Sequence, residues 1–116
     1  AYMLGDLYCP PVEKEDVVIV ASGSGYTTSV CALTEKCKNL QTINLVFTSD
    51  LDSPLAMLGD RVVHIPSSSS LSFSQGGQVM RSLFEQVLFI ICEALVTKLA
   101  AKMDPTVISQ RHANVE

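Results

Sequence analysis

The chain has 116 residues, enough for one domain built around one hydrophobic core. Apolar residues make up 47% of it, so a globular fold is expected. With 8 basic against 12 acidic residues, a net charge of −4 and no basic cluster, the composition argues against nucleic acid as a partner.

Residues 1–4 resemble the end of a strand that enters a turn at Gly5. The segment 7–15 contains Pro10 and Pro11, and we expect it to cross the molecule without regular structure.

Residues 16–21 form a continuous run of mostly β-branched side chains, DVVIVA, without polar alternation. Such a run is typical of a strand that is covered on both faces in a parallel sheet. The turn that follows, residues 21–28, contains Gly23 and Gly25, which adopt backbone angles that other residues resist and let an anion approach the backbone N–H groups.

Hydroxyl groups surround these glycines. Ser22, Ser24 and Thr27 supply donors, and Thr27 or Thr28 is expected to cap a helix whose free N–H groups point toward the turn. A phosphate group could therefore be held without lysine or arginine. The alternative is an ordinary strand-to-helix turn, because the motifs of nucleotide-triphosphate loops and of dinucleotide-binding turns are both incomplete here.

The helix from Thr27 to about Leu40 places Val30, Leu33, Cys37 and Leu40 on one stripe, which we expect to pack on the sheet. Residues 42–47 form the next predicted strand.

A short helix is then expected to start at Ser53 and Pro54 and to end near Gly59. Residues 61–65 form a further predicted strand. The Ser/Gly-rich segment 67–78 that follows is either a linker or a loop over a site.

A long helix is predicted from about residue 79 to residue 103. Glu85 lies on a flank with apolar neighbours, a setting that suits a general base, although a flank residue that simply reaches water fits the periodicity as well. The helix is apolar around most of its circumference, so we expect it to bury a second face against another subunit. Its Arg81, Glu93 and Lys98 argue against a membrane span.

Asp104 and Pro105 are expected to restart the chain as helix cap and first-turn residue, and residues 104–116 form a polar tail. The four cysteines show no C-x-x-C spacing and no companion histidines. We therefore expect reduced thiols of a cytoplasmic protein and no metal site.

Four stretches resemble the sugar isomerase, or SIS, domain, and within it the 6-phospho-3-hexuloisomerase group. They are VVIVASGSGYT (17–27), TSDLDSPLA (48–56), SLFEQ (82–86) and RHANVE (111–116), and together they extend the resemblance over essentially the whole chain. SIS domains generally share the glycine-serine turn, whereas SLFEQ and RHANVE are more specific to the hexuloisomerase group.

The resemblance implies a flavodoxin-like α/β/α sandwich that forms dimers or tetramers. It implies a cofactor-free enzyme of the ribulose monophosphate pathway that interconverts 3-hexulose 6-phosphate and fructose 6-phosphate. The residues that match phosphate ligands are Ser22, Gly23, Ser24, Gly25 and Thr27, and those that match catalytic residues are Glu85 and His112. A sugar-phosphate-sensing SIS module without catalysis is the alternative function.

Three features depart from the family pattern. Tyr26 occupies a position where glutamate is frequent, and Arg81 stands where the hexuloisomerase group often has glycine. The family's N-terminal helix and central first strand have no counterpart. We therefore expect residues 1–116 to be the C-terminal part of a single SIS domain, with a displaced or exchanged strand at residues 1–4 as the alternative.

Overall fold

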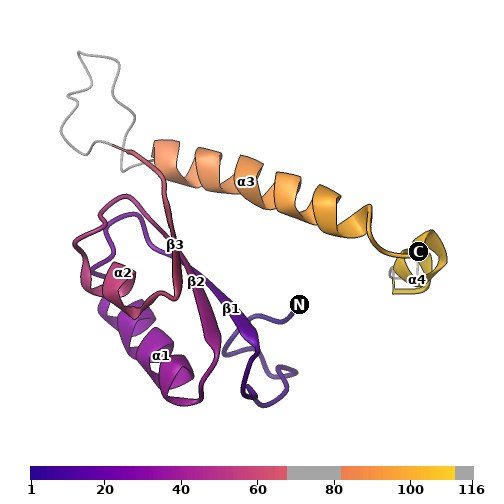
Figure 1. The fold of residues 1–116 in the computed structure, drawn as a ribbon, viewed down its shortest axis with the longest axis horizontal. Coiled ribbons are helices and arrows are strands. Elements are labelled where there is room, and N and C mark those ends of the chain that lie inside the picture. The colour runs from indigo at the N-terminus through magenta and orange to yellow at the C-terminus, as the bar shows by residue number, and fades with distance from the viewer. Residues whose placement is uncertain (68–81, 112–116) are drawn as a thin grey trace.

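A computed structural model describes residues 1–67 and 82–111. Three parallel strands form one sheet in the order β1-β2-β3, and four helices accompany them (Figure 1). The strands are β1 (Val17–Ala21), β2 (Ile43–Thr48) and β3 (Arg61–His64). The helices are α1 (Thr28–Asn39), α2 (Pro54–Leu58), α3 (Ser82–Ala100) and α4 (Pro105–Arg111). This arrangement confirms the predicted α/β class.

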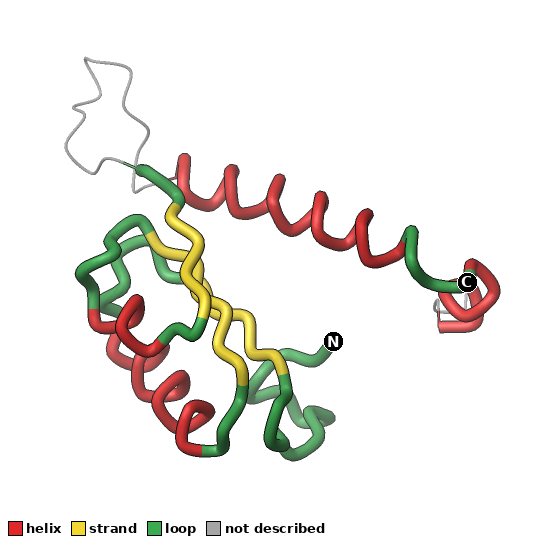
Figure 2. The backbone as a smooth tube through the Cα atoms, in the orientation of Figure 1, coloured by secondary structure: helices red, strands yellow, loops and turns green. Residues whose placement is uncertain are grey.

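The two faces of the sheet are covered by different helices (Figure 2). Side chains alternate along a strand, so Asn44 and Val46 of β2 point to one face and Leu45 and Phe47 to the other. The Asn44 amide contacts a carbonyl of α1, whereas Phe47 packs against α3. The sheet therefore lies between α1 and α2 on one side and α3 on the other, as a three-layer sandwich.

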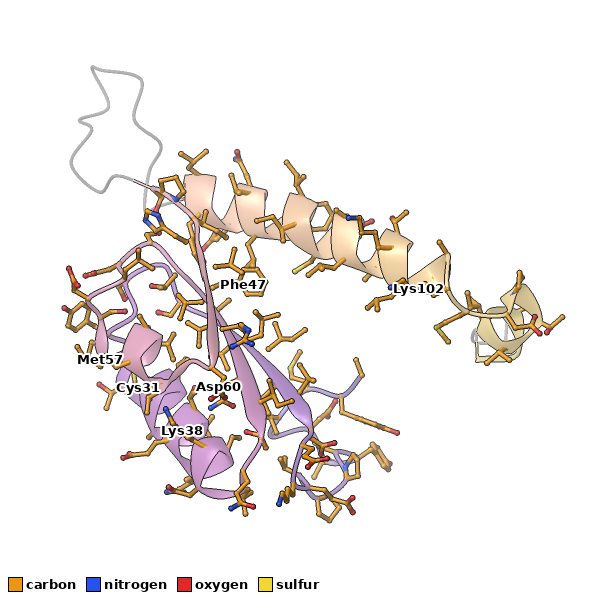
Figure 3. The ribbon with its side chains drawn as sticks, in the orientation of Figure 1. Cys31, Lys38, Phe47, Met57, Asp60 and Lys102 are labelled. Carbon is orange, nitrogen blue, oxygen red and sulfur yellow. The ribbon has the colours of Figure 1, made fainter. Side chains whose placement is uncertain are left out.

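The core lies between the sheet and the first half of α3. Phe47, Ile65 and Phe84 are at most 5% exposed and form one cluster. Figure 3 shows the labelled Phe47 side chain between the sheet and α3. The partly buried side chains packed against this cluster are Leu45, Val63, Val87, Leu88 and Ile91. Burial of these apolar groups is what holds α3 to the sheet.

The opposite face contains a buried polar network around Asn44, which is fully buried. Its side-chain amide donates to the carbonyls of Thr34 and Leu58, and its oxygen accepts from the Thr42 hydroxyl at 2.9 Å. Every hydrogen-bonding group of the side chain is therefore used, as burial requires. The network joins α1, β2 and the end of α2.

The prediction that β1 is covered on both faces is wrong for this chain. Strand β1 is an edge of the sheet, and Val17 and Ile19 are 62% and 60% exposed. They pair with Ile43 and Leu45 of β2 and share the same face of the sheet. Helix α3 covers this face beside β2 and β3 but not beside β1. A groove of about 790 Å³ runs along this edge, and residues 1–4 line it.

Two further expectations fail. Residues 1–4 form no strand, and the chain there is irregular. Helix α1 buries Thr34 and Cys37, whereas Leu33 and Leu40 of the predicted stripe are about half exposed. Leu33 instead lines the groove beside β1, because the described part of the chain places no strand beyond β1 for it to pack on.

The remaining element predictions are close. Helix α2 begins after Ser53, whose hydroxyl accepts the Ala56 N–H at 3.3 Å, and Gly59 is its C-cap. Asp104 likewise caps α4, accepting the Thr106 N–H at 2.9 Å. The segment 68–78 and the tail beyond residue 111 lie outside the described residues. No helix in the described part of the chain is both long and apolar enough to span a bilayer.

Candidate functional site

The turn between β1 and α1 is fixed to the carboxyl end of β2. The Ser22 N–H continues the sheet by donating to the Phe47 carbonyl at 3.0 Å, and the Ser49 N–H donates to the Gly23 carbonyl at 3.1 Å. Within the turn, the Gly25 N–H donates to both the carbonyl and the hydroxyl oxygen of Ser22. The backbone of the turn is therefore organised without any ligand.

Both the backbone conformation and the space beside the backbone require a glycine at position 25. Its φ of +71° is in the left-handed region that favours glycine. A Cβ added there would collide with the side chain of Ser53, which is fully buried at the start of α2. Gly25 is therefore a structural member of the turn, and it is not among the residues that line the adjacent cleft.

Thr27 occupies the N-cap position of α1 but does not cap the helix with its side chain. Its hydroxyl is instead hydrogen-bonded to the Ser22 hydroxyl at 3.0 Å. The expectation of a side-chain cap is thus wrong, while Thr28 is the first helical residue. The first N–H groups of α1 therefore point toward the turn without a capping side chain from Thr27. Free N–H groups at a helix start suit an anion.

A cleft of about 450 Å³ joins this turn to α3. Four of the predicted phosphate ligands line it, and Glu85 lines it from the opposite element. The lining residues are Ala21, Ser22, Gly23, Ser24, Thr27, Val30, Phe84, Glu85 and Leu88. The volume falls within the usual range for small-molecule sites. The structure thus brings the predicted phosphate turn and the predicted base into one cleft.

Glu85 is solvent-exposed where it lines the cleft. Its immediate surroundings there include the apolar side chains of Phe84 and Leu88 from α3 and Val30 from α1. Both features expected from the sequence therefore occur together: the Glu85 carboxylate has apolar neighbours, and it also reaches water. Among the described residues that line the cleft, it is the only charged one. His112 lies outside the described residues.

A second polar group lies at the same edge of the sheet, and its two serines could not be paired from the sequence. Ser49, after β2, and Ser67, after β3, are hydrogen-bonded through their hydroxyls at 2.6 Å. The imidazole Nε2 of His64 lies 3.2 Å from the Ser49 carbonyl. The polar stretch after β2 was the available signal, because parallel strands bring their carboxyl ends to one edge. Pairing Ser49 with Ser67 required the register of β2 and β3.

Within residues 1–67 and 82–111, no three or more histidine, cysteine, aspartate or glutamate side chains are grouped so that they could hold a metal ion. The four cysteines are free thiols, and burial raises the pKa of the Cys37 thiol. The chemistry that the described cleft offers is hydrogen bonding by hydroxyl and backbone N–H groups together with one carboxylate.

A glycine-serine turn thus faces a carboxylate across a cleft at the edge of a parallel sheet. The family model described as "SIS domain" matches residues 1–97. The chain belongs to the SIS domain family. The match covers β1, β2, β3 and most of α3, which are the elements that form the cleft.

Two curated relatives of this SIS domain carry the same name. The chain is 37% identical over 121 residues to a 3-hexulose-6-phosphate isomerase of Mycobacterium gastri, covering 99% of the chain and 60% of the relative. It is 34% identical over 122 residues to a 3-hexulose-6-phosphate isomerase of Bacillus subtilis, covering 100% of the chain and 65% of the relative. The chain thus spans less than two thirds of the length of these relatives.

A solved structure has the same fold. A crystal structure of a hypothetical protein superimposes with a TM-score of 0.81 at 26% identity, covering 97% of this chain and 62% of that protein. The SIS domain described here therefore has the arrangement of strands and helices found in a longer protein.

Proposed function

We propose that this SIS domain serves in the isomerisation of 3-hexulose 6-phosphate and fructose 6-phosphate. The observation that carries the proposal is the shared cleft, which is lined by Ser22, Gly23, Ser24 and Thr27 of the turn and by Glu85 of α3. The identity to two relatives named for this reaction supports the choice of substrate. The reaction needs no cofactor, because a carboxylate is sufficient to move a proton beside a carbonyl group.

The phosphate group binds at the turn. The Ser24 and Thr27 hydroxyls and the first N–H groups of α1 are the donors, and the Ser22 hydroxyl holds Thr27 in place. Because no basic side chain lines the described cleft, hydrogen bonds and the helix dipole provide the attraction. Binding a group remote from the reacting carbons positions the sugar and lowers the entropic part of the barrier.

Glu85 acts as the general base. It removes the proton from C2 of the 3-ketose, and the electrons of that C–H bond form a 2,3-enediolate with negative charge on the C3 oxygen. Return of the proton to C3, with the O2 proton moving to solvent and O3 regaining one, forms the 2-ketose. A hydrogen-bond donor must face the enediolate oxygen, and His112 or a serine of residues 67–74 is our candidate.

The decisive experiment compares the wild type with Glu85→Gln, which keeps the shape of the side chain and removes the base. Turnover of 3-hexulose 6-phosphate should fall by about 10²- to 10⁴-fold, the usual contribution of a positioned base. Affinity for fructose 6-phosphate should remain within about threefold, because the phosphate contacts are elsewhere.

Glu93→Gln is the matched control, since Glu93 is exposed on α3 two turns from Glu85 and does not line the cleft. It should retain full turnover. Equal turnover by Glu85→Gln and the wild type would refute the role of Glu85. Sugar-phosphate binding without turnover by the wild type would instead assign this domain to the non-catalytic SIS modules.

We also propose that the protein is a homodimer or homotetramer of the cytoplasm. Helix α3 carries a second apolar stripe, Phe89, Cys92, Val96 and Leu99, in addition to the side chains that it packs on the sheet. Phe89, Val96 and Leu99 are 60% to 67% exposed, which is typical of an interaction surface. Free thiols fit a reducing compartment.

A further inference from the structure

Two carbonyl groups of the phosphate-binding turn are held by the segment that joins β2 to α2. The Ser49 N–H donates to the Gly23 carbonyl at 3.1 Å, and the Leu55 N–H, in the first turn of α2, donates to the Gly25 carbonyl at 3.2 Å. Both donors belong to the chain that runs from the end of β2 into the first turn of α2, on either side of segment 50–54.

These bonds determine where the following N–H groups point. In a trans peptide the N–H is directed opposite to the carbonyl of the same unit, and the described peptide bonds are trans. The N–H groups of Ser24 and Tyr26 are therefore directed away from the β2–α2 segment. The Tyr26 N–H donates to the Ser24 hydroxyl at 3.2 Å. Ser24 itself lines the cleft.

Ser53 fixes the segment that carries the Ser49 and Leu55 N–H donors. Its hydroxyl donates to the Asp50 carbonyl at 2.6 Å and accepts the Ala56 N–H at 3.3 Å, which closes the segment and caps α2. The same side chain fills the space where Gly25 lacks a Cβ. Ser53 and Leu55 are both fully buried, so solvent does not compete for these contacts.

We propose that Ser53 is a positioning residue for phosphate binding. By fixing the start of α2, it places the Leu55 N–H on the Gly25 carbonyl and so sets the direction of the Tyr26 N–H, which holds the Ser24 hydroxyl at the cleft. The ligand is a phosphate monoester, and the inference rests on the proposed function of the cleft. Ser53 does not touch the ligand, and its effect passes through Leu55 and Gly25.

The test titrates inorganic phosphate and fructose 6-phosphate into the wild type and Ser53→Ala by calorimetry. The Kd for both ligands should rise about tenfold in Ser53→Ala, because the Ser24 hydroxyl, which the Tyr26 N–H holds at the cleft, loses its fixed position. Ser53→Thr, which keeps the hydroxyl, should recover most of the affinity. Amide resonances of Ser24 and Tyr26 should shift in Ser53→Ala before any ligand is added.

Cys37→Ala is the control for a merely structural effect. Cys37 is buried in α1, away from the residues that line the cleft, so its truncation lowers stability without touching the turn. Phosphate affinity should be unchanged in Cys37→Ala. Equal affinity of Ser53→Ala and the wild type would overturn the proposal, and so would an equal loss in Cys37→Ala.

A measurement on the wild type keeps the proposal falsifiable if Ser53→Ala does not fold. Phosphate should slow hydrogen exchange of the Leu55 amide, because binding stabilises the turn that this amide holds. Unchanged exchange at saturating phosphate, or no phosphate binding at all, would overturn the proposal. Phosphate binding without sugar turnover would refute the isomerase function alone.

Discussion

The hydroxyl of Ser22, at the end of β1, is hydrogen-bonded to the hydroxyl of Thr27, at the start of α1, with 3.0 Å between the oxygens. Ser22 is 8% exposed and Thr27 is exposed at the cleft, so the buried hydroxyl orients the accessible one. The two act as a unit, and their substitutions should not be additive.

Thr27→Val and Ser22→Ala should each weaken the binding of fructose 6-phosphate by about tenfold, as expected for a hydrogen bond to a charged group. The double variant should lose little more than Thr27→Val, because Ser22 acts through Thr27. Calorimetric titration measures these affinities. Ser29→Ala, exposed in the first turn of α1, is the matched control; full additivity of the two losses would contradict the coupling.

Phe47 should make a large contribution to stability. It is 1% exposed at the centre of the cluster that joins the sheet to α3. Phe47→Ala should lower the free energy of unfolding by about 3 to 5 kcal/mol, as measured by urea denaturation. Met57→Ala, which removes a side chain that is 73% exposed on α2, should change it by less than about 0.5 kcal/mol. Similar values for both variants would show that α3 is not packed as described.

The Cys37 thiol should be the least reactive of the four cysteines. Burial raises its pKa, so the reactive thiolate is scarcer than at an exposed cysteine. Its folded pKa lies above the unfolded one, so its contribution to stability is present at neutral pH and is lost as the pH rises through the folded pKa. Alkylation at pH 8 with peptide mass spectrometry should modify Cys9, Cys31 and Cys92 first, and earlier modification of Cys37 would contradict its burial.

The second apolar stripe on α3 should mediate self-association. Phe89→Glu places a charge among exposed apolar side chains, and it should shift sedimentation from dimer or tetramer to monomer. Thr97→Glu introduces the same charge on the same helix at an exposed position outside the stripe, and it should leave the assembly intact. A monomeric wild type, or an unchanged assembly in Phe89→Glu, would refute this interface.

Local signals in the sequence were sufficient for most elements. The Ser53-Pro54 start and the Gly59 end of α2 were predicted correctly, because capping depends on residues that are neighbours in the chain. The three hydroxyls that the sequence places around the turn, those of Ser22, Ser24 and Thr27, line one cleft in the structure. The sequence predicts Thr27 or Thr28 as the cap of α1, whereas in the structure the Thr27 hydroxyl pairs with Ser22.

Properties that depend on neighbouring strands were less predictable. The apolar run of β1 indicates a strand buried on both faces, yet Val17 and Ile19 are exposed because β1 is an edge. The run alone cannot tell which strands lie beside it. The close approach of the Ser53 side chain to Gly25 could not be predicted either, since the two residues meet only after β1 and β2 have paired.

The strand order β1-β2-β3 also has a consequence for folding. Each strand pairs with the one that follows it in the chain, so each pairing closes a short loop that contains one helix. Short loops lose little entropy on closure and favour rapid folding. Helix α3 packs on a surface that both later strands must first form. We therefore expect residues 17–65 to form the sheet before α3 packs on it, so that the cleft is completed last.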